Sequence, residues 1–268
     1  MGRYVISLKD DLVTAGRGLR ELFFPRRCVV CGRWLAREET DLCPACREEL
    51  PLTYHWDIVQ NAAFERLALR FEVEAAASLF FFRTESDYRK IIYALKYGGR
   101  PALGRRMGHL LGEQLKGSRS FRDIQAIVPV PLHPLRRWKR GYNQAEAIAR
   151  GLSAALGLPV ETALLRRRRY TKTQTRLHGA AKTKNVAQAF RVNDSRAAQL
   201  QEAGIRHLLL VDDVLTTGST LAACAAPLRA AGFKLSAATL RGYSRGYSER
   251  ISERRASAWA YSRRSQRT

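Results

Sequence analysis

The chain of 268 residues carries 47 Lys and Arg against 24 Asp and Glu, so its formal net charge is +23. Hydrophobic residues make up 46% of the sequence, enough for the core of one α/β domain with a small appendage. No apolar run reaches the roughly 18 residues of a transmembrane helix. The charged N-terminus has no apolar signal core, which favours a cytoplasmic location.

The high positive charge predicts affinity for polyanions, with nucleic acid first and anionic lipid second. The alternative is a generally Arg-rich proteome, which raises the isoelectric point without any polyanionic partner. Between Arg136 and Arg191 the chain has 14 Lys or Arg against two Glu, which suits an electropositive channel for a single strand.

Four of the five cysteines form two C-x2-C knuckles: Cys28, Cys31, Cys43 and Cys46. Each knuckle turns two thiolates toward one point, and two knuckles complete a tetrahedral sulfur site. Zinc suits thiolates, and four protein ligands leave no open position, so we expect a structural Zn²⁺ site of zinc-ribbon type. The same ligands permit an iron–sulfur centre, whereas a reducing cytosol disfavours two disulfides.

The cysteine module and its surroundings are expected to occupy residues 1–60. A module this small buries little apolar surface, so the metal should supply most of its folding free energy. An amphipathic helix is predicted over residues 8–24. A minor core is expected from Phe23, Phe24, Pro25, Trp34 and Leu42.

From residue 75 onward, apolar runs alternate with helical periodicity. We predict strands at about residues 75–83, 124–130, 206–211 and 234–240. Helices are predicted over residues 85–97, 102–115 and 143–156 and between the last two strands, where Pro227 should kink or interrupt the helix. This order predicts an α/β domain over residues 75–241, with a mostly parallel sheet covered on both faces. Ligands of such sheets lie beyond the carboxyl ends of the strands.

The strand at residues 206–211 runs into two carboxylates and a small hydroxylated turn. The carboxylates can accept hydrogen bonds from vicinal ribose hydroxyls. The amides and hydroxyls of the turn can hold a phosphate at the start of the next helix, and Gly218 allows a close backbone approach. A sugar-phosphate site is therefore predicted at Asp212, Asp213, Thr216, Thr217, Gly218, Ser219 and Thr220.

Two basic segments precede this site. The loop Pro131–Gly141 carries cations that suit a diphosphate, although a solvated basic turn has the same composition. These cations are Arg136, Arg137, Lys139 and Arg140. Asn143 is expected to cap the helix that follows. Residues 166–190 form a long, polar and basic segment, and long loops inside compact domains tend to be functional or mobile.

These motifs resemble known families. VDDVLTTGST resembles the phosphoribosyl-pyrophosphate (PRPP) signature of type I phosphoribosyltransferases. The four cysteines, LKYGG at Leu95–Gly99, PVPLHPLRRWKRGYNQ, TKTQTRLHG and KNVAQAF together extend the resemblance to the ComF family over about residues 20–242. This family comprises the competence ComFC proteins and their GntX-like relatives.

The resemblance implies a zinc ribbon before a type I phosphoribosyltransferase-like, Rossmann-like domain that binds PRPP with Mg²⁺. It places the ribose on Asp212 and Asp213, the 5-phosphate on the turn from Thr216 to Thr220, and the pyrophosphate on the loop Pro131–Gly141. Residues 166–190 then correspond to a flexible hood over PRPP. Its candidate ligands are Lys172, Gln174, Arg176 and Lys184. Where the family commonly has an Arg shortly before the Asn of the NV segment, this chain has Lys182, Thr183 and Lys184.

The resemblance also implies a role in natural transformation and in the handling of incoming single-stranded DNA. The implied partners are PRPP, single-stranded DNA and other competence proteins such as a ComFA-type helicase. Two alternatives stay open. One is a nucleotide-salvage or amidotransferase-like phosphoribosyltransferase, and the other is a non-enzymatic DNA-binding adaptor with a vestigial PRPP pocket. Nothing in the sequence identifies an acceptor substrate.

Residues 242–268 extend beyond the family resemblance and form a basic tail. From Arg241 onward the chain has eight Arg and two Glu, with Tyr and Trp between them. Arg interleaved with aromatic residues is compatible with nucleic-acid contacts. A disordered, solvated tail without a partner would have the same composition.

Overall fold

The computed structural model describes residues 26–81, 86–167 and 189–242. The chain divides into two compact units, Met1–Leu50 and Pro51–Thr268. Residues 51–60, which the sequence pattern grouped with the cysteine module, lie in the larger unit. The helix expected over residues 8–24 and the basic tail after residue 242 lie outside the described residues.

The described part of the smaller unit is a ribbon of tight turns with one short helix. Arg27 and Trp34 form an antiparallel bridge that closes the first cysteine knuckle. The second knuckle opens helix α2 (Pro44–Glu48), with Cys43 as its N-cap. Leu42 is buried as expected, but the prediction for Trp34 was wrong. Trp34 is 53% exposed, and the Arg27 guanidinium lies over its ring, 3.6 Å from the ring centroid.

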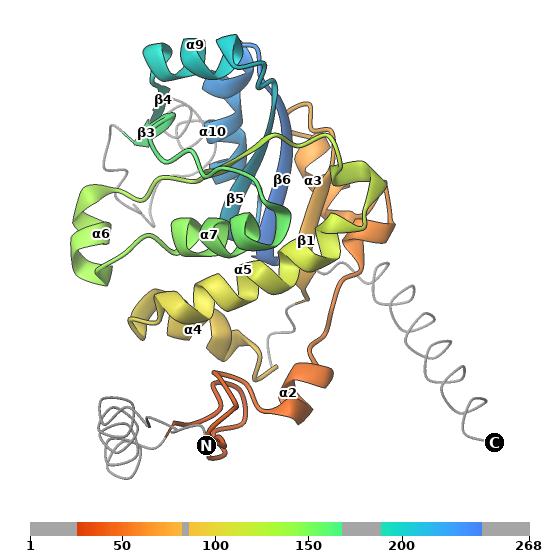
Figure 1. Ribbon diagram of the computed structural model, residues 1–268, viewed down its shortest axis with the longest axis vertical. Helices are drawn as coiled ribbons and strands as arrows, with labels where there is room; N and C mark the ends of the chain where they lie inside the picture. The colour runs from red at the N-terminus through yellow and green to blue at the C-terminus, as the bar shows by residue number, and fades with distance from the viewer. Residues whose placement is uncertain (1–25, 82–85, 168–188, 243–268) are drawn as a thin grey trace, which may run out of the picture. The chain divides into compact units, whose positions relative to one another are not determined.

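The larger unit is built on a four-stranded sheet in the order β1-β6-β5-β2 (Figure 1). Every neighbouring pair is parallel, which confirms the predicted fold class. The strands are β1 (Ala76–Phe80), β2 (Ala126–Pro129), β5 (His207–Val214) and β6 (Lys234–Arg241). Strands β3 (Leu165–Arg167) and β4 (Phe190–Val192) form a separate antiparallel pair.

Helices cover both faces of the sheet because successive strand residues point to opposite sides. Leu208 and Leu210 of β5 belong to a core cluster with Leu221 and Leu228 of α10 (Ser219–Ala230). Leu209 is equally buried but lies outside that cluster. It faces the side on which α7 (Gln144–Leu156) packs against β2 and β5, with α5 (Pro101–Lys116) packed on α7 (Figure 1).

The remaining elements frame this core. They are 3-10 helices η1 (His55–Asp57) and η2 (Arg119–Phe121) and helices α3 (Ala62–Ala68), α4 (Arg89–Tyr97), α6 (Pro134–Arg140) and α9 (Asp194–Glu202). Within the described ranges, no helix combines the length and the apolar content needed to cross a bilayer.

A buried polar cluster fixes residues 53–61 to β1, which explains why this segment belongs to the larger unit. The side-chain amide of Asn61 donates to the carbonyl oxygens of His55 and Ala76 at 3.0 and 2.8 Å. Its oxygen accepts from the N–H groups that open α3. Nδ1 of His55 accepts the N–H of Ser78 at 3.3 Å. Burial lowers the pKa of His55 to about 4, so the ring is neutral at pH 7.

Helices α5 and α7 approach closely at glycines. A Cβ added to Gly151 would lie 2.0 Å from the carbonyl oxygen of Arg105, and one added to Gly108 would lie 2.1 Å from that of Ile148. Only glycine allows this separation of the two helix backbones. The contact fixes α7, whose first residues border the cavity described below.

Two local predictions were wrong, and the interruption expected as one outcome at Pro227 does not occur. The loop expected at residues 131–141 contains helix α6, because the His133 side chain caps it, Pro134 opens it and Gly141 ends it at a φ of +77°. Strand β5 continues to Val214, since its pairing with β6 extends through that residue. Helix α10 runs through Pro227, which lies in its last turn, where the helix ends three residues later.

Candidate functional site

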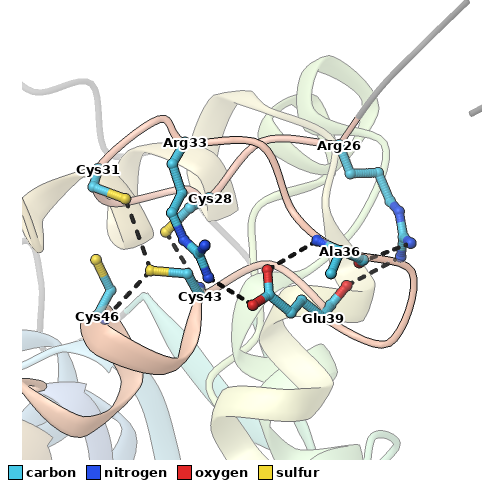
Figure 2. Close-up of polar contacts among 8 residues, drawn as sticks. All are labelled: Arg26, Cys28, Cys31, Arg33, Ala36, Glu39, Cys43 and Cys46. Carbon is cyan, nitrogen blue, oxygen red and sulfur yellow. Dashed lines mark hydrogen bonds and ion pairs between the residues drawn. The ribbon is translucent and has the colours of Figure 1, made fainter. Parts of the chain in front are cut away.

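The four cysteine sulfurs converge on one point (Figure 2). All four lie within 4.8 Å of one another, and the sulfurs of Cys31 and Cys43 are 3.8 Å apart. A tetrahedral zinc ion with Zn–S bonds of about 2.3 Å requires a sulfur–sulfur separation of about 3.8 Å. None of the four is disulfide-bonded, a bond that needs about 2.05 Å. The donor set and its spacing therefore fit a closed, four-thiolate metal site.

Neighbouring donors favour the thiolate of Cys43, the form that binds metal. The pKa of Cys43 falls to about 6, first because the backbone N–H of Cys46 donates to its sulfur at 3.4 Å. A hydrogen bond from the Arg33 guanidinium lowers this pKa further. Arg33 is itself held by Glu39 at 2.6 Å, and Glu39 accepts the N–H of Ala36 at 2.9 Å (Figure 2). Spacing alone did not indicate Arg33 or Glu39, because their roles depend on how the turn folds.

A second site is a cavity of about 290 Å³ at the carboxyl ends of β2, β5 and β6. Parallel strands bring their carboxyl ends to the same edge of the sheet, as the sequence pattern predicted. The predicted residues that line it are Asp212, Asp213, Thr216, Thr220, Arg136 and Arg140. They come from β5, the turn into α10, and α6.

Three further cations line the cavity: Lys96, Arg167 and Arg241. Lys96 lies in the last turn of α4 and places its Nζ 3.2 Å from Oδ2 of Asp213. Arg167 ends β3, and Arg241 ends β6. Lys96 lies in the LKYGG motif, and Arg167 lies in the basic segment 166–190, whereas no motif in the sequence indicated Arg241. The lining carries five cations and two carboxylates, so the cavity suits a ligand with several negative charges.

The two carboxyl groups differ in their surroundings. The pKa of Asp212 rises to about 8, first because burial disfavours its charge and second because Asp213 is negatively charged. Lys96 opposes this rise. Oδ1 of Asp212 accepts the backbone N–H of Asp213 at 2.9 Å. Asp212 therefore gains its negative charge only as the pH rises toward about 8.

Hydrogen bonds fix the junction of α6 and α7 at the cavity wall. Asn143 caps α7 as predicted, and its amide donates to the carbonyl oxygen of Val130 at 3.0 Å. The guanidinium of Arg140 donates to Gln144 at 3.0 Å. The hydroxyl of Tyr142 donates to the carbonyl oxygen of Leu95 at 2.5 Å, which ties this junction to α4.

Other predicted residues lie elsewhere. Arg137 is directed to Glu146 of α7 at 3.8 Å, and neither it nor Lys139 is among the lining residues. Thr217 and Ser219 bond each other through their hydroxyls at 2.9 Å. Gly218 has a φ of +76°, and a Cβ there would lie 2.9 Å from the Leu67 side chain. The hood candidates Lys172, Gln174, Arg176 and Lys184 lie outside the described residues.

The fold and the two sites define a class of protein in which a four-cysteine, zinc-ribbon-like cluster precedes an α/β domain with a parallel four-stranded sheet flanked by helices. Residues 19–56 match the family described as a double zinc ribbon domain. "DNA utilization protein YhgH" of Escherichia coli K12 is 31% identical over 207 residues, covering 73% of this chain and 80% of that protein. "Competence protein F" of Haemophilus influenzae is 29% identical over 207 residues, covering 74% and 89%. The chain belongs to the ComF family.

Proposed function

We propose that the cavity binds PRPP and that the protein handles single-stranded DNA during its uptake and use. The observation that carries the first part is the convergence of Asp212 and Asp213 with Thr216, Thr220 and five cations in one cavity. The second part is supported by the names of the relatives, which refer to competence and to DNA utilization. The net charge of +23 agrees with a polyanionic partner.

Each part of PRPP has a matching group in the cavity. The carboxylates of Asp212 and Asp213 can accept hydrogen bonds from the two ribose hydroxyls. Thr216 and Thr220 stand at the turn into α10, where hydroxyls and the amides at the helix start suit the 5-phosphate. The guanidinium groups of the lining suit the pyrophosphate because they bind phosphate oxygens in pairs.

Mg²⁺ fits this proposal as a companion of PRPP. Among the described residues, the cysteine cluster is the one group of three or more His, Cys, Asp or Glu side chains close enough to hold a metal by themselves. Mg²⁺ usually takes one or two carboxylates together with phosphate oxygens of the substrate and water. Asp212 and Asp213 could supply those carboxylates, and the bound ion would neutralise charge on the pyrophosphate.

The cysteine ribbon is proposed to hold a structural Zn²⁺. Its four thiolates leave no open coordination position, so the ion would stabilise the ribbon rather than catalyse a reaction. Metal analysis of protein purified without added zinc should find about one zinc per chain. A folded ribbon with iron and sulfide, or with no metal, would contradict the assignment.

PRPP binding is tested by calorimetric titration of PRPP with Mg²⁺ into the zinc-loaded protein. Saturable binding is expected for the wild type and its loss for the Asp212→Asn/Asp213→Asn double variant. Glu146→Gln is a matched control, since Glu146 lies on α7 outside the cavity lining. Absence of binding by the folded wild type would refute the PRPP pocket.

Catalysis is proposed as transfer of the 5-phosphoribosyl group of PRPP to a nucleophile. The bond between C1 of the ribose and pyrophosphate would break, pyrophosphate would leave with the electron pair, and the nucleophile would bond to C1. Release of pyrophosphate in the presence of candidate bases is the measurement. Release with a nucleobase would favour a salvage role, whereas strand binding without any release would favour a non-enzymatic adaptor.

The cellular setting follows from the same proposal. The protein is proposed to encounter both incoming single-stranded DNA and PRPP in the cytoplasm. Its proposed protein partner there is a ComFA-type helicase. Co-purification of a tagged chain with such a helicase, and its loss when the helicase is absent, tests this partner.

A further inference from the structure

Exposed apolar side chains are concentrated on two helices, α4 and α6, that each contribute to the cavity lining. The described residues include seven large hydrophobic side chains that are exposed, and four of them lie on α4 and α6. These four are Tyr93, Tyr97, Leu135 and Trp138, which together with Lys139 and Arg140 we call the α4–α6 surface. Trp138 is 87% exposed and Tyr97 is 72% exposed. Exposed aromatic groups that contribute nothing to the core mark a contact surface.

Helix geometry places these side chains in two rows. On α4, Tyr93 and Tyr97 are four residues apart, and their ring centroids are 6.0 Å apart. On α6, Leu135 lies three residues before Trp138 and four before Lys139, so these three share one face of the helix. The end of α6 meets the end of α4, because the Arg140 guanidinium lies 5.7 Å from the centroid of the Tyr97 ring.

The charge of α6 favours a polyanion on this surface. The helix has the sequence PLRRWKR, with four cations and no acid. Aromatic faces next to Lys and Arg can stack on bases while the cations contact the phosphates. A duplex has its bases stacked inside, so exposed Trp and Tyr faces suit a single strand better.

We propose that the α4–α6 surface is a stacking platform for single-stranded nucleic acid. The inference deepens the proposed handling of single strands, on which it rests, and assigns it to particular residues. Trp138 and Tyr97 stack on bases, and Lys139 contacts a phosphate. Arg140 belongs both to this surface and to the cavity lining, so it is the residue through which a strand and a ligand in the cavity would affect each other.

The test measures the affinity of the zinc-loaded full chain for a fluorescent oligo(dT) of about 15 nucleotides by anisotropy. Trp138→Ala is expected to weaken binding by about 5- to 150-fold, since stacking on one base contributes on the order of 1–3 kcal/mol. Trp138→Phe should retain most of the affinity. Trp138→Leu should bind as weakly as the Ala variant, because Leu keeps apolar volume but has no aromatic face.

The matched control is Leu69→Ala, which removes an apolar side chain that is 90% exposed and lies outside this surface. Its affinity should stay unchanged. Lys139→Gln should reduce the slope of log K against log salt by about 0.7, the value for one phosphate contact on a single strand. Titration of PRPP into each variant distinguishes the two sites. The affinity for PRPP should stay unchanged, since Trp138 and Lys139 do not line the cavity.

The outcomes are distinguishable. If the wild type does not bind oligo(dT), the proposed strand handling fails and the platform fails with it. If the wild type binds but Trp138→Ala and Tyr97→Ala bind equally well, only the platform is overturned. If Trp138→Leu keeps the wild-type affinity for oligo(dT), the contact is apolar rather than stacking, which also overturns the platform.

Discussion

Asp212→Asn should make the protein more stable at alkaline pH while weakening its ligand site. In the wild type, burial and the charge of Asp213 raise the pKa of Asp212 to about 8, against about 3.9 in an unfolded chain. Between these values the folded state binds a proton that the unfolded state has lost. The stability of the wild type therefore falls as pH rises through this window.

The magnitude follows from linkage. One proton of difference changes the free energy of unfolding by about 1.4 kcal/mol per pH unit. With a folded pKa of about 8, the wild type should lose about 2 kcal/mol between pH 6 and pH 8, and little more above that. Asn is neutral throughout, and its Oδ1 can still accept the backbone N–H of Asp213. The variant should therefore lack this loss.

The assay is urea unfolding at pH 6, 7, 8 and 9, followed by tryptophan fluorescence, to which Trp56, buried in the larger unit, contributes. Asp123→Asn, at a side chain that is 75% exposed, serves as the control and should track the wild type. Parallel stability curves for the wild type and Asp212→Asn would refute the raised pKa. Such a gain in stability at the expense of binding is typical of functional sites.

Three further predictions concern packing, metal and ligand. Gly151→Ala should lower stability by about 2 kcal/mol and the midpoint of thermal unfolding by about 4–8 °C, because the clash outweighs the helix propensity of Ala. Gly117→Ala, with no atom within 4 Å, should change little. Cys31→Ser should release zinc and expose residues 26–50 to protease while the larger unit keeps its unfolding transition; simultaneous loss of both would contradict two independent units. Lys96→Met should weaken PRPP binding about tenfold in calorimetry, and an unchanged affinity would remove Lys96 from the site.

Several conclusions followed from the sequence because they depend on short segments. Cys28 and Cys31, like Cys43 and Cys46, are ligands whose spacing within a knuckle is set by one local turn. Asp212 and Asp213 sit at the end of a strand that its own apolar pattern reveals. The parallel sheet was predictable because alternating strands and helices allow few other arrangements.

The tertiary structure decided what depends on elements that are distant in sequence. Lys96 lies in the last turn of α4, and Arg167 and Arg241 end β3 and β6. These three residues meet only because the fold brings the ends of α4, β3 and β6 to one cavity. The need for glycine at Gly151 depends on the separation of two helices, which no single segment encodes. The raised pKa of Asp212 likewise arises from burial, which only packing creates.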